Sequence, residues 1–101
     1  MIEGADYEFE WDDAKAESNL RKHGVDFMEA MSVFADPLMM TRFDDEHSED
    51  EERWVSLGRS GNGRFLLVVH TFSATGPSSA LVRLISARSA TRRERARYEQ
   101  V

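Results

Sequence analysis

The chain has 101 residues, no cysteine and a formal net charge of −6, which predicts a single domain over residues 1–101 and excludes disulfides and thiolate metal sites. Residues 1–11 lack the basic and apolar regions of a secretory signal, and no apolar run approaches the roughly 20 residues that span a bilayer, so we expect a soluble, cytoplasmic protein without membrane contact. The charges are sorted along the chain: residues 1–58 hold 17 of the 19 acidic side chains, and residues 59–101 hold eight arginines and two acids.

The N-terminal half is predicted to contain one strand and two helices. Tyr7–Trp11 has aromatic residues at period two, which is typical of a strand. Asp12 is a suitable N-cap for a first helix, which Gly24 ends. A second helix begins after Asp26 and has apolar residues at i, i+3, i+4 and i+7, the pattern of a buried stripe. Asp36-Pro37 ends this helix.

The C-terminal half is predicted to be rich in strands. Seven acids among the nine residues of Asp44–Glu52 predict an exposed loop, and the small residues of Ser73–Ser79 predict another. The remaining elements are the strands Leu38–Phe43, Arg53–Arg59, Arg64–Phe72 and Leu81–Arg88 and a terminal helix, Ala90–Gln100. The order β-α-α-β-β-β-β-α predicts an α+β fold, an antiparallel sheet meander with two N-terminal helices and one C-terminal helix, the helices packed on one face.

The arginines of residues 59–101 indicate an anion-binding surface, because a guanidinium group binds phosphate or carboxylate through two parallel hydrogen bonds. The overall acidity argues against non-specific adhesion to nucleic acid. The alternative is that this basic part pairs with the protein's own acidic part, or with an acidic partner.

The segment Ser60–Gly63 predicts a hairpin turn. With a four-residue loop, Arg59 lies opposite Arg64 and Arg53 lies opposite His70, all on one face of the sheet. Two facing arginines repel unless an anion lies between them. A two-residue turn would instead shift these pairs by two positions. The alternative to an anion site is that the arginines simply extend into solvent.

The last strand carries two further arginines. Arg83 and Arg88 face opposite sides of this strand, so they cannot be assumed to bind the same ligand. Arg88 lies where the strand ends, beside the start of a helix whose N-terminal amides favour anions. We expect either a phosphate at this position or a local bond from Arg88 to backbone carbonyls.

The first helix has a polar, cationic face formed by Lys15, Asn19, Lys22 and His23, at i, i+4, i+7 and i+8. This face is either an ordinary solvated surface, with cations well placed for the helix dipole, or a second wall that contacts phosphates. His47 in the acidic loop matches no metal-binding spacing, and the chain contains no nucleotide-binding or nucleophile motif. We therefore expect neither a metal site nor a cofactor.

Residues spread from about 7 to 100 match the pattern of a known family: Trp11-Asp12, Lys15, Asn19-Leu20, Lys22-His23-Gly24-Val25, Phe27, Ala30, Val33-Phe34, Asp36-Pro37, Glu52-Arg53, Leu57-Gly58-Arg59, Ile85-Ser86-Ala87-Arg88, Arg93-Glu94 and Tyr98-Glu99. In these residues the chain resembles the BrnT family, the toxin halves of bacterial type II toxin–antitoxin pairs. The resemblance implies a RelE-like ribonuclease fold and RNA cleavage that inhibits translation. It also implies a cognate BrnA-like antitoxin with a ribbon-helix-helix DNA-binding part, through which alone the toxin would contact operator DNA. The chain departs from the family in its acidic insert, Asp44–Glu52, and its longer Ser73–Ser79 loop.

A ribonuclease that uses no metal must deprotonate a 2′-hydroxyl, protonate the leaving 5′-oxygen and stabilise the charge that develops on phosphorus. Arginines supply the last function, and a histidine supplies the proton transfers. The candidate catalytic residues are therefore four phosphate-binding arginines and one acid/base histidine: Arg53, Arg59, His70, Arg83 and Arg88. The candidate RNA-binding residues are Lys15, Lys22 and His23. The alternative function is a non-catalytic module that docks an acidic protein or nucleic acid through its arginine-rich C-terminal half.

Overall fold

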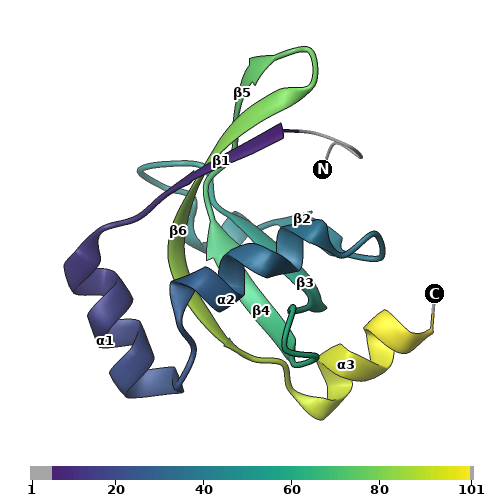
Figure 1. Cartoon of the computed structure of the whole chain (residues 1–101). Coiled ribbons are helices and arrows are strands. Elements are labelled where there is room, and N and C mark those ends of the chain that lie inside the picture. The colour runs from purple at the N-terminus through teal and green to yellow at the C-terminus, as the bar shows by residue number, and fades with distance from the viewer. Residues whose placement is uncertain (1–5, 101) are drawn as a thin grey trace.

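The computed structural model describes residues 6–100, and in this part of the chain it has an α+β fold with a six-stranded sheet and three α-helices (Figure 1). Residues 1–5 and 101, which belong to the predicted domain 1–101, lie outside the described residues. The elements are β1 (Asp6–Glu10), α1 (Asp13–His23), α2 (Phe27–Ser32), the short 3₁₀ helix η1 (Val33–Ala35), β2 (Met40–Phe43), the 3₁₀ helix η2 (Asp45–His47), β3 (Trp54–Arg59), β4 (Phe65–His70), β5 (Ser73–Gly76), β6 (Ser79–Ser89) and α3 (Arg92–Glu99). No helix within these residues is long and apolar enough to cross a membrane.

The helix ends lie close to where the sequence predicts them. Asp12 caps α1 by accepting hydrogen bonds from two backbone N–H groups of its first turn, and Gly24 ends that helix in the left-handed conformation with φ of 66°. Asp26 caps α2 by accepting a hydrogen bond from the backbone N–H of Met28. Thr91 and Glu94 form a reciprocal capping box at the start of α3.

The strands lie in the order β1-β6-β4-β3-β2, and β5 pairs with the N-terminal end of β6. The pairs β2–β3, β3–β4, β4–β6 and β5–β6 are antiparallel, whereas β1 runs parallel to β6. The prediction of a loop over Ser73–Ser79 is wrong. This segment contains β5, which forms a hairpin with β6 that extends away from the other strands in Figure 1. Its residues are small and largely exposed, so the strand leaves no alternating apolar pattern in the sequence.

The β3–β4 hairpin has a different register from the predicted one. Arg59 pairs with Phe65, and Trp54 pairs with His70, so the predicted pairs of Arg59 with Arg64 and of Arg53 with His70 are wrong. Ser60 also pairs with Arg64, because its N–H donates to the Arg64 carbonyl, and only residues 61–63 remain in the turn. The turn is therefore one residue shorter than predicted, and Gly63 closes it with a left-handed φ of 82°. A register change of one residue moves each side chain to the opposite face of the sheet.

One face of the sheet is covered by α1 and α2, and we call it the covered face. Its side chains pack with those of the helices in the main core, whose most buried members are Val25, Phe27, Ala30, Val33, Leu66, Val68, Val82, Leu84 and Ala87. Asn19 fixes α1 to this face, because its amide bonds both the N–H and the C=O of Ala87 in β6, at 3.0 and 2.9 Å, and the carbonyl of Val25 at 3.0 Å. Asn19 is therefore a buried structural residue rather than part of a solvated polar face.

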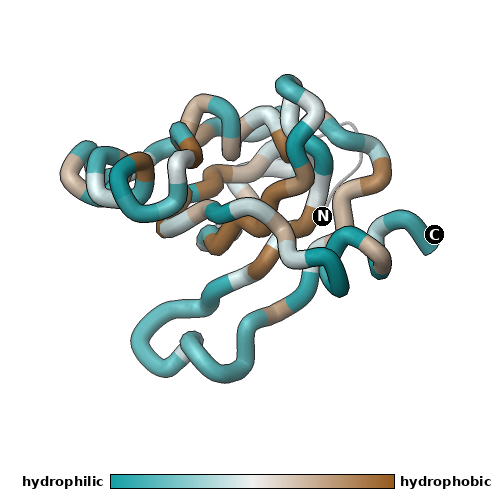
Figure 2. Tube along the Cα trace, turned by 90° about the horizontal axis from the view of Figure 1, so that it is seen from below, coloured by the Kyte–Doolittle hydropathy of each residue, from teal (hydrophilic) through white to brown (hydrophobic). Residues whose placement is uncertain are grey.

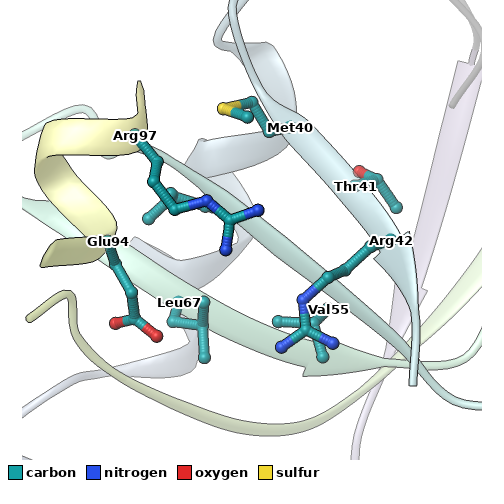
Figure 3. A pocket seen from close by; sticks show the side chains of 8 residues that line it. Met40, Thr41, Arg42, Val55, Leu67, Glu94 and Arg97 are labelled. Carbon is teal, nitrogen blue, oxygen red and sulfur yellow. The ribbon is translucent and has the colours of Figure 1, made fainter. Parts of the chain in front are cut away.

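The other face of the sheet, which we call the open face, is only partly covered. Val55, Leu57 and Leu67 on this face pack against Ala90 and Tyr98, which come before and within α3. Figure 3 shows Val55 and Leu67 between α3 and β2. The prediction that all helices pack on one face is thus wrong for α3. In Figure 2 the long hydrophilic loop between β2 and β3 extends away from the apolar strands.

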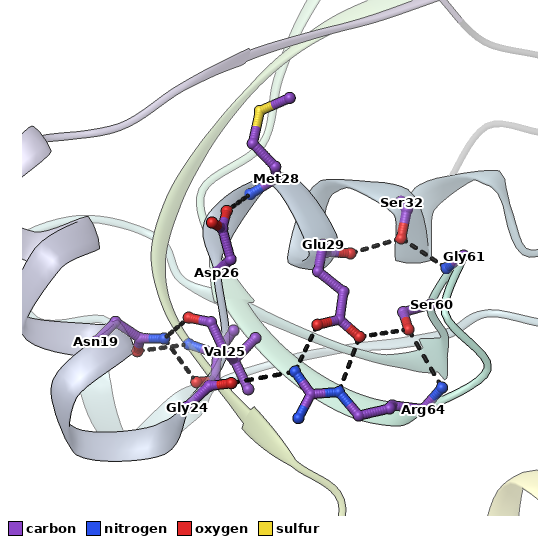
Figure 4. Close-up of polar contacts among 11 residues, drawn as sticks. Asn19, Gly24, Val25, Asp26, Met28, Glu29, Ser32, Ser60, Gly61 and Arg64 are labelled. Atoms are coloured by element: carbon purple, nitrogen blue, oxygen red, sulfur yellow. Dashed lines mark hydrogen bonds and ion pairs between the residues drawn. The ribbon is translucent and has the colours of Figure 1, made fainter.

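Arg64 is held on the covered side of the hairpin by an ion pair with Glu29 of α2 (Figure 4). Its Nε donates to Glu29 Oε2 at 2.9 Å, and its Nη2 donates to the carbonyl of Gly24 at 3.1 Å. Ser60 donates to the same carboxylate at 2.7 Å. The hydrogen bond from Arg64 is the main cause that lowers the pKa of Glu29. Arg64 therefore fixes the hairpin to α2 and does not face Arg59.

His70 is enclosed in the main core with no exposed surface. Its Nδ1 lies 2.8 Å from the carbonyl of Thr71, which makes Nδ1 the protonated nitrogen. Its Nε2 therefore accepts a hydrogen bond from Ser56 at 2.7 Å, and its ring packs edge-on against Phe34. Burial lowers the pKa of His70 from 6.5 to about 4.

We expect the buried His70 to make the protein less stable in acid. Unfolded His70 binds a proton below pH 6.5, whereas folded His70 does so only below about pH 4, so stability should fall by about 3 kcal/mol between these values. Urea unfolding at a series of pH values measures this loss. His70→Gln should lose less stability over the same window, because the titrating group is absent. Identical pH profiles for the two proteins would contradict the prediction.

Gly58 in β3 lies where η1 approaches the sheet. A Cβ atom there would be 2.8 Å from Val33 Cγ1 and 3.2 Å from Asp36 Oδ2. We expect Gly58→Ala to lower the free energy of unfolding by about 1–3 kcal/mol through overpacking. Gly61→Ala is the matched control, since its Cβ would meet only ordinary contacts with Ser32 at 3.6 Å. Equal denaturant midpoints for the two variants would show that the approach is not constrained.

Candidate active site

The open face holds a groove of about 500 Å³ between β2, the acidic loop and the end of β6. We call it the arginine groove. Its polar side chains are Arg42, His47, Arg53, Ser86 and Arg88 together with the carboxylates of Asp44, Asp45 and Glu46, and its apolar ones are Phe43, Val55, Leu67, Val69 and Ile85. Two of the four predicted phosphate-binding arginines, Arg53 and Arg88, therefore line one concave surface.

Arg88 is placed in the groove by its position opposite Leu67 in the sheet. Its Nη1 and Nη2 donate to the two carboxylate oxygens of Glu94, at 2.7 and 2.9 Å. Nη1 also donates to the carbonyl of Ser89. The hydrogen bonds from Arg88 lower the pKa of Glu94 to about 2, so the pair is charged at neutral pH. The other edge of the guanidinium, formed by Nε and the second hydrogen of Nη2, has no partner among residues 6–100 and can bind an anion through two hydrogen bonds.

Arg53 contributes a second guanidinium from the start of β3. Its Nε is buried and has no hydrogen-bond partner among the described residues, and its Nη2 lies 4.0 Å from the carboxylate of Glu51. A buried N–H without a partner is costly. An anion that reached this N–H would remove that cost.

His47, in η2 of the acidic loop, is a residue that the sequence analysis did not select. Its Nδ1 lies 3.0 Å from Oδ2 of Asp44, a carboxylate that is itself buried. The ring side chain is 63% exposed and lines the groove, so its Nε2 is accessible to a ligand. The acidic loop gave no spacing that would have singled out this pair. Within residues 6–100, no three His, Cys, Asp or Glu side chains are grouped so as to hold a metal ion.

The other predicted catalytic residues lie outside the groove. Arg83 forms an ion pair with Glu51 of the acidic loop. The guanidinium of Arg59 lies 5.7 Å from the centre of the Phe65 ring, at the hairpin end of the sheet. His70 is buried on the covered face, and its predicted approach to Arg53 depended on the incorrect register. We therefore do not retain His70 as the acid/base candidate.

The three candidate RNA-binding residues of α1 lie beside the groove. Lys15, Lys22 and His23 line a shallow pocket of about 230 Å³, which also includes Ile85 and Ser86 of β6. The same two residues of β6 line the arginine groove. The cationic face of α1 and the arginine groove therefore meet along one segment of β6.

Comparisons with known proteins match this architecture. A family model described as the ribonuclease toxin BrnT of type II toxin–antitoxin systems matches residues 11–94. The crystal structure of the ribonuclease toxin BrnT from Brucella abortus is similar with a TM-score of 0.55 and 24% sequence identity, over 86% of this chain and 99% of that chain. This identity supports a shared fold, and none of the curated proteins matches the chain.

The family match spans most of the chain and confirms the resemblance seen in the sequence. Ribonuclease toxins of this kind act on RNA and are paired with an antitoxin. The chain therefore belongs to the BrnT family of type II toxin–antitoxin systems, and it is an endoribonuclease with RNA as its substrate and an antitoxin as its partner.

Proposed function

We propose that the toxin cleaves RNA in the arginine groove without a metal ion, with Arg53 and Arg88 binding the scissile phosphate and His47 transferring the proton. The observation that carries the proposal is the pair of guanidinium groups with unused donors on one concave surface. Arg88 offers one free edge while Glu94 fixes the other. Such preorganised donors stabilise charge that develops on a phosphoryl group.

In the proposed reaction, the 2′-oxygen attacks the adjacent phosphorus and the bond from phosphorus to the 5′-oxygen breaks. The proton of the 2′-hydroxyl passes to Nε2 of His47 and from there to the leaving 5′-oxygen. The products are a 2′,3′-cyclic phosphate and a 5′-hydroxyl. The guanidinium groups neutralise the added negative charge on phosphorus, and Asp44 holds the imidazole in place through Nδ1.

The RNA strand would continue from the groove onto α1. Lys15, Lys22 and His23 share the Ile85–Ser86 wall with the groove, and this proximity supports the proposal that they contact the neighbouring phosphates. Arg59 and Arg83 lie outside this path and are not assigned to the reaction.

The cellular part of the proposal follows from the family. Cleavage by this RelE-like, single-domain toxin would inhibit translation in the cytoplasm. A BrnA-like antitoxin with a ribbon-helix-helix part would neutralise it, and operator DNA would be contacted only through that antitoxin. Membership of the BrnT family supports these assignments.

Cleavage of RNA by the purified toxin in the presence of EDTA tests the proposal. Arg53→Ala and Arg88→Lys should each lower the cleavage rate by about 10²-fold through loss of a donor to the phosphate, and His47→Ala should lower it by roughly 10²–10⁴-fold. Arg92→Ala removes an exposed arginine outside the groove and should cleave as the wild type does.

Three outcomes would contradict the proposal. Wild-type rates in Arg53→Ala and Arg88→Lys would remove the assigned phosphate site. Loss of cleavage in EDTA would show that a metal is required. Intact RNA together with stoichiometric protein binding would favour the non-catalytic docking module.

A further inference from the structure

A second, smaller pocket adjoins the arginine groove between β2 and α3, and we call it the β2–α3 pocket (Figure 3). Its volume is about 110 Å³. Arg42, Val55 and Leu67 line both spaces. A ligand in the arginine groove can therefore extend one of its groups into the β2–α3 pocket.

The floor of the β2–α3 pocket is apolar. It is formed by Val55, Leu57 and Leu67, which are 5–9% exposed and belong to the small core of the open face. Such a floor offers no hydrogen bonds and favours a flat apolar surface laid over it.

Two guanidinium groups stand over this floor from opposite sides. Arg42 reaches across from β2, and Arg97 reaches across from α3 (Figure 3). Neither guanidinium has an ion pair or a hydrogen bond within the described part of the chain. Guanidinium groups stack on aromatic rings and donate hydrogen bonds, but they accept none. The Glu94 carboxylate also lines the pocket, but its two oxygens already accept hydrogen bonds from Arg88. The free donors of the walls therefore suit a planar ring that presents oxygen or nitrogen acceptors at its edge.

The size of the β2–α3 pocket limits what it can hold. One water occupies roughly 10–15 Å³ by the same measure, so 110 Å³ corresponds to several waters. This is enough for a single heterocyclic ring system. It is too small for a nucleotide with its sugar and phosphate, which would remain in the adjoining groove.

We propose that the β2–α3 pocket binds one nucleobase of the RNA next to the bond that is cut, and that it selects a base with a carbonyl oxygen at purine C6 or pyrimidine C4, guanine or uracil. This inference rests on the proposed cleavage in the arginine groove. Single-stranded RNA is commonly read by splaying a base onto arginine or aromatic planes. The O6 atom of guanine and the O4 atom of uracil match the donors of Arg42 and Arg97, whereas adenine and cytosine carry an amino donor at the same position.

The test is to map the ends of the fragments that the purified toxin makes from RNA of mixed sequence. The wild type should cut mainly where guanine or uracil occupies one fixed position beside the cleaved bond. Arg97→Ala should lower this preference about tenfold, through loss of one set of base contacts, and should still cut RNA. Arg93→Ala is the matched control, since it removes an exposed arginine from the same helix, and it should keep the wild-type preference.

The outcomes separate this inference from the proposed function. RNA left intact by the wild type would overturn the proposed function. Cleavage without a base preference, or a preference unchanged in Arg97→Ala, would overturn the pocket assignment alone. If Arg97→Ala fails to fold, Arg42→Met provides the same comparison from the opposite wall, and it should also cut with less preference for guanine and uracil.

Discussion

The structure of the open face depends on the hydrogen bonds that the carboxylate of Asp36 accepts. It accepts hydrogen bonds from the backbone N–H groups of Leu38 and Arg59, at 2.9 and 2.8 Å, and from the hydroxyl of Tyr98 at 2.8 Å. Burial alone would raise the pKa of Asp36, but these hydrogen bonds lower it below its ordinary value. One side chain thus joins the end of η1, the end of β3 and α3. Because α3 buries none of its residues fully, this bond fixes the helix that forms one wall of the β2–α3 pocket.

Ion pairs among the described residues use some of the arginines of the C-terminal half and leave others without an acidic partner there. Part of the arginine-rich half does pair with the protein's own acids: Arg64 with Glu29, Arg83 with Glu51 and Arg88 with Glu94. These pairs fix the hairpin, the acidic loop and the start of α3. The guanidinium groups around the arginine groove keep unused donors. Internal pairing therefore accounts for Arg64 and Arg83. Arg88 pairs with Glu94 through one edge of its guanidinium and keeps the other edge for the proposed anion.

Local signals predicted the elements well, because helix ends depend on the few residues that form them. The caps at Asp12, Gly24 and Asp26 are such signals. The hairpin register depended on the backbone angle of one residue, Gly63, and a change of one position moved His70 from the groove to the core. The residues that carry the family resemblance include Asn19, Asp36 and Tyr98, which the structure uses for packing. A resemblance of this kind identifies the fold more securely than it identifies the reacting groups.

The remaining site residues had no signal in the sequence. Arg42 and Arg97 are 55 positions apart, and they line the same pocket only because α3 packs against the open face. His47 lies in a loop whose composition predicts solvent exposure, and its pairing with Asp44 is a product of the loop conformation. Tertiary structure alone brings these groups together.

The central claim is that RNA phosphates bind the guanidinium groups of the open face. Titration with a 2′-deoxy oligonucleotide, which cannot be cleaved through a 2′-oxygen, tests it directly when the arginine Nε–H signals are followed by NMR. The Nε–H signals of Arg53 and Arg88 should shift together, while that of Arg64, held by Glu29 on the covered side, should stay unchanged. Unchanged signals for Arg53 and Arg88 at saturating oligonucleotide would contradict the account.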